Sequence, residues 1–91
     1  MTAEEYKEAI KDLMLIPGVS RSMADDLIQM GIKKVKDLKN KDAERLYSKS
    51  NRQAGVTQDR NLLYTLRCAV YFASNETHDP EKLKVANWKD K

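Results

Sequence analysis

The sequence predicts a small all-α protein, folded as a single compact domain of five or six helices over residues 1–91. Charged residues make up 34% of the chain, and three Gly and two Pro leave few positions for turns. Apolar residues recur at intervals typical of helices along most of the chain, and no segment shows the strict alternation of a half-buried strand.

The first helix is expected to begin after Thr2, because Thr2 and Glu5 have the spacing of a capping box. Its apolar face follows at helical spacing and consists of Tyr6, Ala9, Ile10, Leu13 and Met14. We expect Pro17 to end this helix, because proline disfavours helical geometry at the preceding residue and donates no hydrogen bond.

The second helix is expected to use Ser20 as its N-cap, and Gly31 suits the position just beyond its end. A short third helix over the same core is predicted from the spacing of Ile32, Val35 and Leu38. Either Asn40 or Asp42 could cap a fourth helix, which Gly55 would end.

Thr57 is expected to cap the fifth helix, whose residues 62–73 are apolar on nearly every side. Such a helix is usually central and surrounded by the others. Asp79 and Pro80 indicate the start of a short last helix, and Trp88 is expected to fold back over the core. Residues 76–91 are therefore predicted to form a C-terminal extension packed on that core.

The net charge of +3 is unevenly distributed along the chain. Residues 1–31 have 3 Lys/Arg against 6 Asp/Glu, whereas residues 32–60 have 9 against 4. A basic excess of this size favours a polyanionic partner, although a solvated surface would have the same composition.

Residues that could support catalysis or metal binding are isolated. Cys68 is the only cysteine and His78 the only histidine, which is too few for a zinc site. Cys68 lies in the most apolar predicted helix, where a buried, inert thiol is expected. Asp25 and Asp26 are adjacent and would point in different directions on a helix. We expect no enzymatic activity, no metal and no cofactor.

A cytoplasmic location is expected, with no membrane contact. The residues after Met1 are polar and acidic, unlike a secretory signal. Residues 62–73 include Arg67 and are too short to span a bilayer. A single cysteine fits a reducing compartment.

Residues 13–28, LMLIPGVSRSMADDLI, resemble a helix-hairpin-helix motif. Gly18 and Val19 match the Gly-apolar pair of the motif, and Ala24 matches its later small residue. Ser20 replaces the second Gly, and Ser22 stands where DNA-binding members often have Lys. The resemblance implies that the free amides at the start of the second helix could hold a backbone phosphate without reading sequence.

We therefore expect nonspecific DNA binding without catalysis. The candidate DNA-contacting residues are Gly18, Val19, Ser20, Arg21, Ser22, Lys33, Lys34, Lys36, Lys49, Arg52 and Arg60. The alternative is a protein–protein interaction module with no nucleic-acid contact, in which the same turn simply joins two helices.

A wider resemblance covers most of the chain. The segments IPGVSRSMADDLIQMGIKKVKDL, DRNLLYTLRCAVYFA and HDPEKLKVANWKD are similar to the bacterial pathogenicity-locus family, whose members are often labelled mitomycin-resistance proteins. The portion GIKKVKDL is also similar to the helix-hairpin-helix-like domain of TfoX-type competence regulators. These resemblances imply a helical, intracellular domain of the SAM-like class. The label adds drug sequestration as a third hypothesis.

Overall fold

The computed structural model describes residues 1–90, and all regular secondary structure in that range is helical. The four α-helices are α1 Ala3–Leu13, α2 Arg21–Gln29, α3 Ala43–Ala54 and α4 Arg60–Ser74. Three short 3₁₀ helices are η1 Val35–Leu38, η2 Pro80–Leu83 and η3 Val85–Trp88. The all-α class is confirmed. The expected count of five or six helices differs from this arrangement, because the short third helix and the last helix are 3₁₀ segments.

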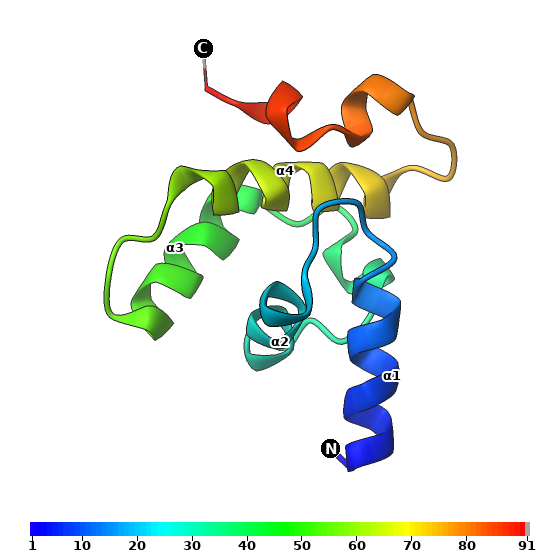
Figure 1. Ribbon diagram of the computed structural model, residues 1–91, viewed down its shortest axis with the longest axis vertical. Helices are drawn as coiled ribbons and strands as arrows, with labels where there is room; N and C mark the ends of the chain where they lie inside the picture. The colour runs from blue at the N-terminus through cyan, green and yellow to red at the C-terminus, as the bar shows by residue number, and fades with distance from the viewer. Residues whose placement is uncertain (91) are drawn as a thin grey trace.

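Helix α4 lies at the centre of the molecule. It packs against α3, η1, η2 and η3. Figure 1 shows η2 and η3 along one side of α4, and α1, α2 and α3 on its other side. Leu63, Leu66, Cys68 and Ala69 of α4 are almost completely inaccessible to solvent. The predicted central position of this helix is confirmed.

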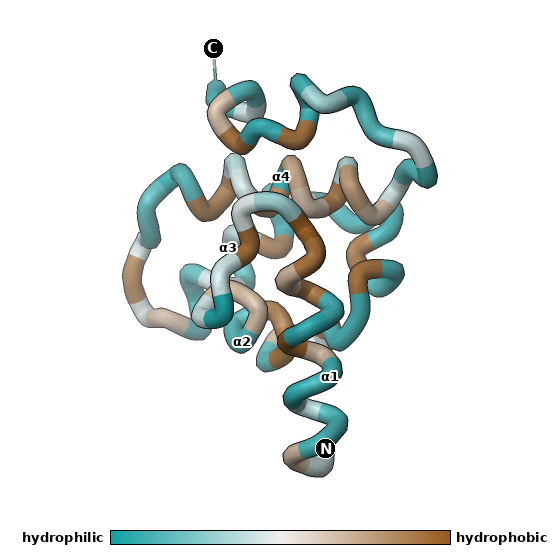
Figure 2. The backbone as a smooth tube through the Cα atoms, turned by 45° about the vertical axis from the view of Figure 1, so that its right-hand side comes forward, coloured by the Kyte–Doolittle hydropathy of each residue, from teal (hydrophilic) through white to brown (hydrophobic). Residues whose placement is uncertain are grey.

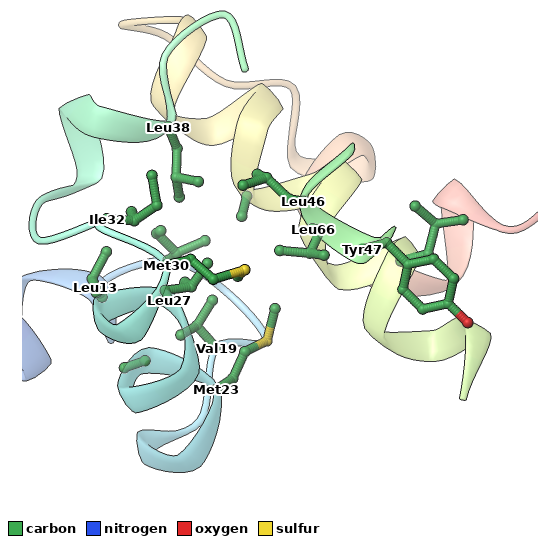
Figure 3. Close-up of a cluster of buried hydrophobic side chains, with 14 of the residues drawn as sticks. Leu13, Val19, Met23, Leu27, Met30, Ile32, Leu38, Leu46, Tyr47 and Leu66 are labelled. Carbon is green, nitrogen blue, oxygen red and sulfur yellow. The ribbon is translucent and has the colours of Figure 1, made fainter. Parts of the chain in front are cut away.

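The hydrophobic core lies between α4 and the other helices. Figure 3 shows side chains from α2 and the segments beside it converging with Leu38, Leu46 and Leu66. Figure 2 shows the first turns of α1 as a hydrophilic projection from this core. Burial of the apolar stripes is the main stabilisation available to helices this short, because isolated helices of this length are marginal in water.

Helix α1 begins as expected and ends early. Thr2 and Glu5 form the capping box, with the Glu5 amide donating to Thr2 Oγ1 over 3.1 Å. The helix ends at Leu13, before proline requires it to. The amide of Leu15 donates to Asp12 O and that of Ile16 to Leu13 O, both over 3.1 Å. Met14 is therefore outside the helix and is 46% exposed, so its predicted place on the buried face is wrong.

The predicted boundaries of α2 and α3 are largely correct. Ser20 Oγ accepts from the Met23 amide over 3.2 Å, and Gly31 follows α2 with φ 89°. Asp42, not Asn40, caps α3, since Asp42 Oδ1 accepts from the Glu44 amide over 2.9 Å.

The start of α4 was predicted incorrectly. Asp59 is the N-cap, in place of Thr57, and its Oδ1 accepts from the Asn61 amide over 2.7 Å. Gln58 explains why the turn between α3 and α4 extends to Asp59. Its side-chain Nε2 donates to Ser50 Oγ, and its backbone amide donates to Asn51 Oδ1. These two contacts fix the chain against α3 before α4 begins.

The C-terminal segment, residues 76–90, folds along α4. Asp79 caps η2 and Pro80 begins it, as expected. The Trp88 ring lies against that of Tyr71, with 5.7 Å between centroids, and Trp88 Nε1 donates to Lys82 O over 2.7 Å. Within residues 1–90, no helix combines the length and the apolar character required to cross a bilayer.

Candidate functional site

The connection between α1 and α2, residues 14–20, is termed the α1–α2 turn. The two helices pack against each other, and Tyr6 Oη donates to Asp25 Oδ1 over 2.5 Å across their interface. Val19 is buried among Met23 and Leu27, as Figure 3 shows, and Ala24 is fully buried. The small side chain of Ala24 allows the two helices to approach closely. The turn is therefore held in place from its inner side.

The outer side of the α1–α2 turn exposes backbone amides. Gly18 has φ +83°, a left-handed conformation that glycine adopts without steric cost. Among residues 1–90, the amides of Gly18, Ser20, Arg21 and Ser22 have no protein acceptor. The Val19 amide donates to Ile16 O over 3.1 Å, so in this conformation it is not free to donate to a phosphate. Its side chain is buried, as expected for the apolar residue of the motif.

The start of α2 combines positive and negative contributions to the local potential. The helix dipole places partial positive charge at its first turn, and Arg21 is exposed there. Asp25 follows one turn later, with Tyr6 Oη and Gln29 Nε2 donating to its carboxylate. This hydrogen bond to Asp25 is the main reason that the pKa of Tyr6 is raised. Asp25 is thus directed toward α1 and Gln29.

Two other elements pack against the α1–α2 turn. A Cβ atom placed on Gly18 would lie 2.7 Å from Val85 Cγ2 of η3 and 3.5 Å from Thr65 Cγ2 of α4. Only glycine leaves room for Val85 at this point. The C-terminal segment therefore contacts one edge of the turn, a contact that sequence reasoning did not anticipate.

Lys33, Lys34 and Lys36 lie beyond the other end of α2. Lys33 and Lys34 line the same hollow as the acidic residues of α1, Glu5, Glu8 and Asp12. The pKa of Glu5 is lowered chiefly by its hydrogen bonds with Thr2, and the charge of Lys33 contributes a smaller part. Lys33 and Lys34 therefore lie near carboxylates, and the surface around them is not exclusively basic.

The remaining predicted cations lie on α3 and α4. Lys49 Nζ donates to Met30 O at the end of α2 over 3.3 Å, and Arg52 is exposed in the last turn of α3. Nine residues of helix span about 13 Å, which separates Lys49 from Arg21. Arg60 is at the start of α4 and forms an ion pair with Asp90. The predicted site residues therefore occupy three places on the molecule.

Cys68 and His78 are both held by packing and polar contacts within the fold. Cys68 is fully buried, its Sγ lies 3.6 Å from Lys82 O, and burial raises the pKa of its thiol. His78 stacks on Phe72, and its Nε2 lies 2.8 Å from the Phe72 carbonyl oxygen. Across the described residues, no group of three or more His, Cys, Asp or Glu is placed to hold a metal ion.

Comparison with known proteins identifies the family. No curated protein and no solved structure matches the chain significantly. The family model described as Cdd1, pathogenicity locus, matches residues 6–91. This match includes the α1–α2 turn, α4 and the C-terminal segment, and the chain therefore belongs to the Cdd1 pathogenicity-locus family.

Proposed function

We propose that this protein is a non-catalytic helix-hairpin-helix domain of the SAM-like class that binds duplex DNA nonspecifically in the cytoplasm. The observation that supports this most is the exposed start of α2. There the amides of Ser20, Arg21 and Ser22 lack an acceptor among residues 1–90. A backbone phosphate would accept from these amides, and no cofactor is needed for that contact.

The local geometry suits an anion more than a neutral partner. The amides at a helix start point outward along the axis and add to the dipole. Gly18 brings the backbone to the surface without a side chain, and Arg21 adds a full positive charge. Ser20 directs its Oγ to the Met23 amide, so it leaves the other amides of the first turn available.

The lysines at the far end of α2 would make a second, independent contact. A separation of about 13 Å is too large for one phosphate to reach both ends of α2. Removal of charge at either end should therefore weaken DNA binding separately. If about four phosphates are engaged, the slope of log K against log salt should be near −3.6, at about −0.9 per phosphate.

Fluorescence anisotropy of a labelled duplex across a salt series tests the proposal. Arg21→Gln should weaken binding at low salt and reduce the slope by about 0.9, because one phosphate contact is lost. Arg45→Gln is the matched control, since Arg45 is exposed on α3 and belongs to none of the proposed contacts. Absence of binding at low salt rejects the proposal, and equal effects of the two variants reject the role of the α1–α2 turn.

A protein-interaction module is the second candidate. Met14 and Leu15 are adjacent in the α1–α2 turn and are 46% and 67% exposed, which is unusual for large apolar side chains at one place. A partner that is captured equally well before and after nuclease treatment, and that Leu15→Ser releases, would favour this function. Leu15→Ser should leave DNA binding unchanged if the amides are the phosphate contact.

A further inference from the structure

Asp90 occupies a binding site made by three side chains of α4. Arg60 Nε donates to Asp90 Oδ2 over 2.8 Å, and Arg60 Nη2 also contacts this oxygen. Arg67 Nη2 lies 2.9 Å from Asp90 Oδ1, and Tyr64 Oη donates to Oδ2 over 3.4 Å. Residues 60, 64 and 67 fall on one face of a helix, so the site is built on a rigid element.

The site is arranged for an anion. Hydrogen bonds from Arg60 first, and then from Arg67, lower the pKa of Asp90 below its ordinary range. Arg67 is oriented by two further partners, Glu44 Oε1 at 2.6 Å and the Trp88 carbonyl oxygen at 2.8 Å. Guanidinium groups held in this way bind carboxylate and phosphate oxygens with the same donors.

The same stretch of chain also contacts the α1–α2 turn. Val85 packs on Gly18, and Asp90 binds Arg60, so residues 85–90 contact both the α1–α2 turn and one of the cations predicted from the sequence to bind DNA. Figure 1 shows this stretch running beside α4. A phosphate that uses the same donors of Arg60 and Arg67 would have to displace Asp90, because these donors are directed to its carboxylate.

We propose that Arg60, Tyr64 and Arg67 form a phosphate-binding site and that Asp90 is its internal competitor. The DNA backbone as the source of the phosphate rests on the proposed function. The evidence for the site itself is that it already binds the carboxylate of Asp90. Displacement of residues 85–90 would remove Val85 from Gly18 and the Asp90 carboxylate from the two arginines in one step.

Inorganic pyrophosphate is the probe for the site, because it supplies phosphate oxygens without a nucleic acid. Trp88 is the only tryptophan and lies in the displaced stretch, so its fluorescence reports displacement. Asp90→Asn should bind pyrophosphate about threefold more tightly than the control, since exposed ion pairs have modest effects. The control is Glu76→Gln, which changes the charge equally at an exposed residue of the C-terminal segment. Far-UV circular dichroism establishes that both variants are folded.

Adding Arg60→Gln to Asp90→Asn should abolish the gain in pyrophosphate affinity. Equal pyrophosphate affinity in Asp90→Asn and Glu76→Gln would overturn the inference, because only net charge would then matter. A gain that persists after Arg60→Gln would overturn it as well.

Duplex DNA provides the second arm of the experiment. Asp90→Asn should bind DNA about threefold more tightly than Glu76→Gln. If pyrophosphate binding increases and no variant binds DNA, the phosphate site stands and the proposed function fails. If DNA binds with equal affinity to both variants and pyrophosphate shows no gain, the proposed function stands and the inference fails.

Discussion

Gly18 shows how one residue serves both the fold and the candidate site. Its φ of +83° reverses the chain between α1 and α2, and its lack of a side chain admits Val85. The backbone conformation alone would favour glycine here. The contact with Val85 adds a second, steric requirement that Gly31 does not have, because nothing lies within 4 Å of a Cβ placed on Gly31.

Substitution of these two glycines by alanine separates the two requirements. Gly31→Ala should lower the free energy of unfolding by about 1–2 kcal/mol, the cost of a left-handed residue with a side chain. Gly18→Ala should lower it by about 1–3 kcal/mol more, because Val85 must also move. Chemical denaturation measures both values.

Val85→Ala is the control for the steric requirement at Gly18. It should remove most of the difference between Gly18→Ala and Gly31→Ala, because the atom that a Cβ on Gly18 would meet is then absent. A difference that is unchanged in the Val85→Ala background would contradict the contact.

Local residue chemistry made part of the candidate site predictable. Ser20 as a cap and Gly18 as a turn residue follow from short-range rules on capping and left-handed backbone. The bond from the Val19 amide to Ile16 O closes a four-residue turn with Pro17 and Gly18 at its centre, where Gly18 has a positive φ. Val85 is 67 positions from Gly18 in the sequence. No local pattern indicates that contact.

At the scale of elements, most helices were predictable and two boundaries were not. Capping residues and apolar periodicity located α1, α2 and α3 to within a few residues. Thr57 and Asp59 are both good caps, and the contacts of Gln58 with α3 decide between them. The spacing of apolar residues in 35–38 does not distinguish a 3₁₀ turn from a short α-helix.

The C-terminal segment should show an acid transition that belongs to Asp90. A lowered pKa means that Asp90 stabilises docking of the segment above the ordinary aspartate pKa. This contribution is lost only as the pH falls through the lower, folded-state value. Trp88 fluorescence should therefore report undocking below the ordinary aspartate range.

Asp90→Asn is the comparison for this acid transition. It should eliminate the transition, because the asparagine does not titrate. A transition within the ordinary aspartate range, or one retained in Asp90→Asn, would contradict the role of the ion pairs with Arg60 and Arg67.

For the whole molecule, stability should depend mainly on the packing around α4. Leu66 is 1% exposed, whereas Leu15 is 67% exposed. Leu66→Ala should lower the free energy of unfolding by about 2–5 kcal/mol, because it leaves a cavity in the core. Leu15→Ala should change it by less than about 0.5 kcal/mol. Similar losses in thermal or chemical unfolding would contradict a core centred on α4.

The distribution of charge over the folded molecule could not be predicted from the sequence. The basic excess of residues 32–60 favours a polyanionic partner but does not specify where the cations lie. Folding places Lys33 and Lys34 beside the carboxylates of α1, and pairs Arg60 with Asp90, 30 positions away. The turns of the chain direct side chains that are close in sequence to different parts of the surface. Tertiary packing therefore decides which cations share a surface. The proposed DNA interface is accordingly centred on backbone amides.

Titration of the ¹⁵N-labelled protein with a short duplex, followed by amide chemical shifts, tests the central claim most directly. We expect the largest shifts at Ser20, Arg21 and Ser22, because their amides would donate to a phosphate, and little change at Val19, whose amide is engaged by Ile16 O. Unchanged positions for the three amides at DNA concentrations that saturate binding would contradict the account.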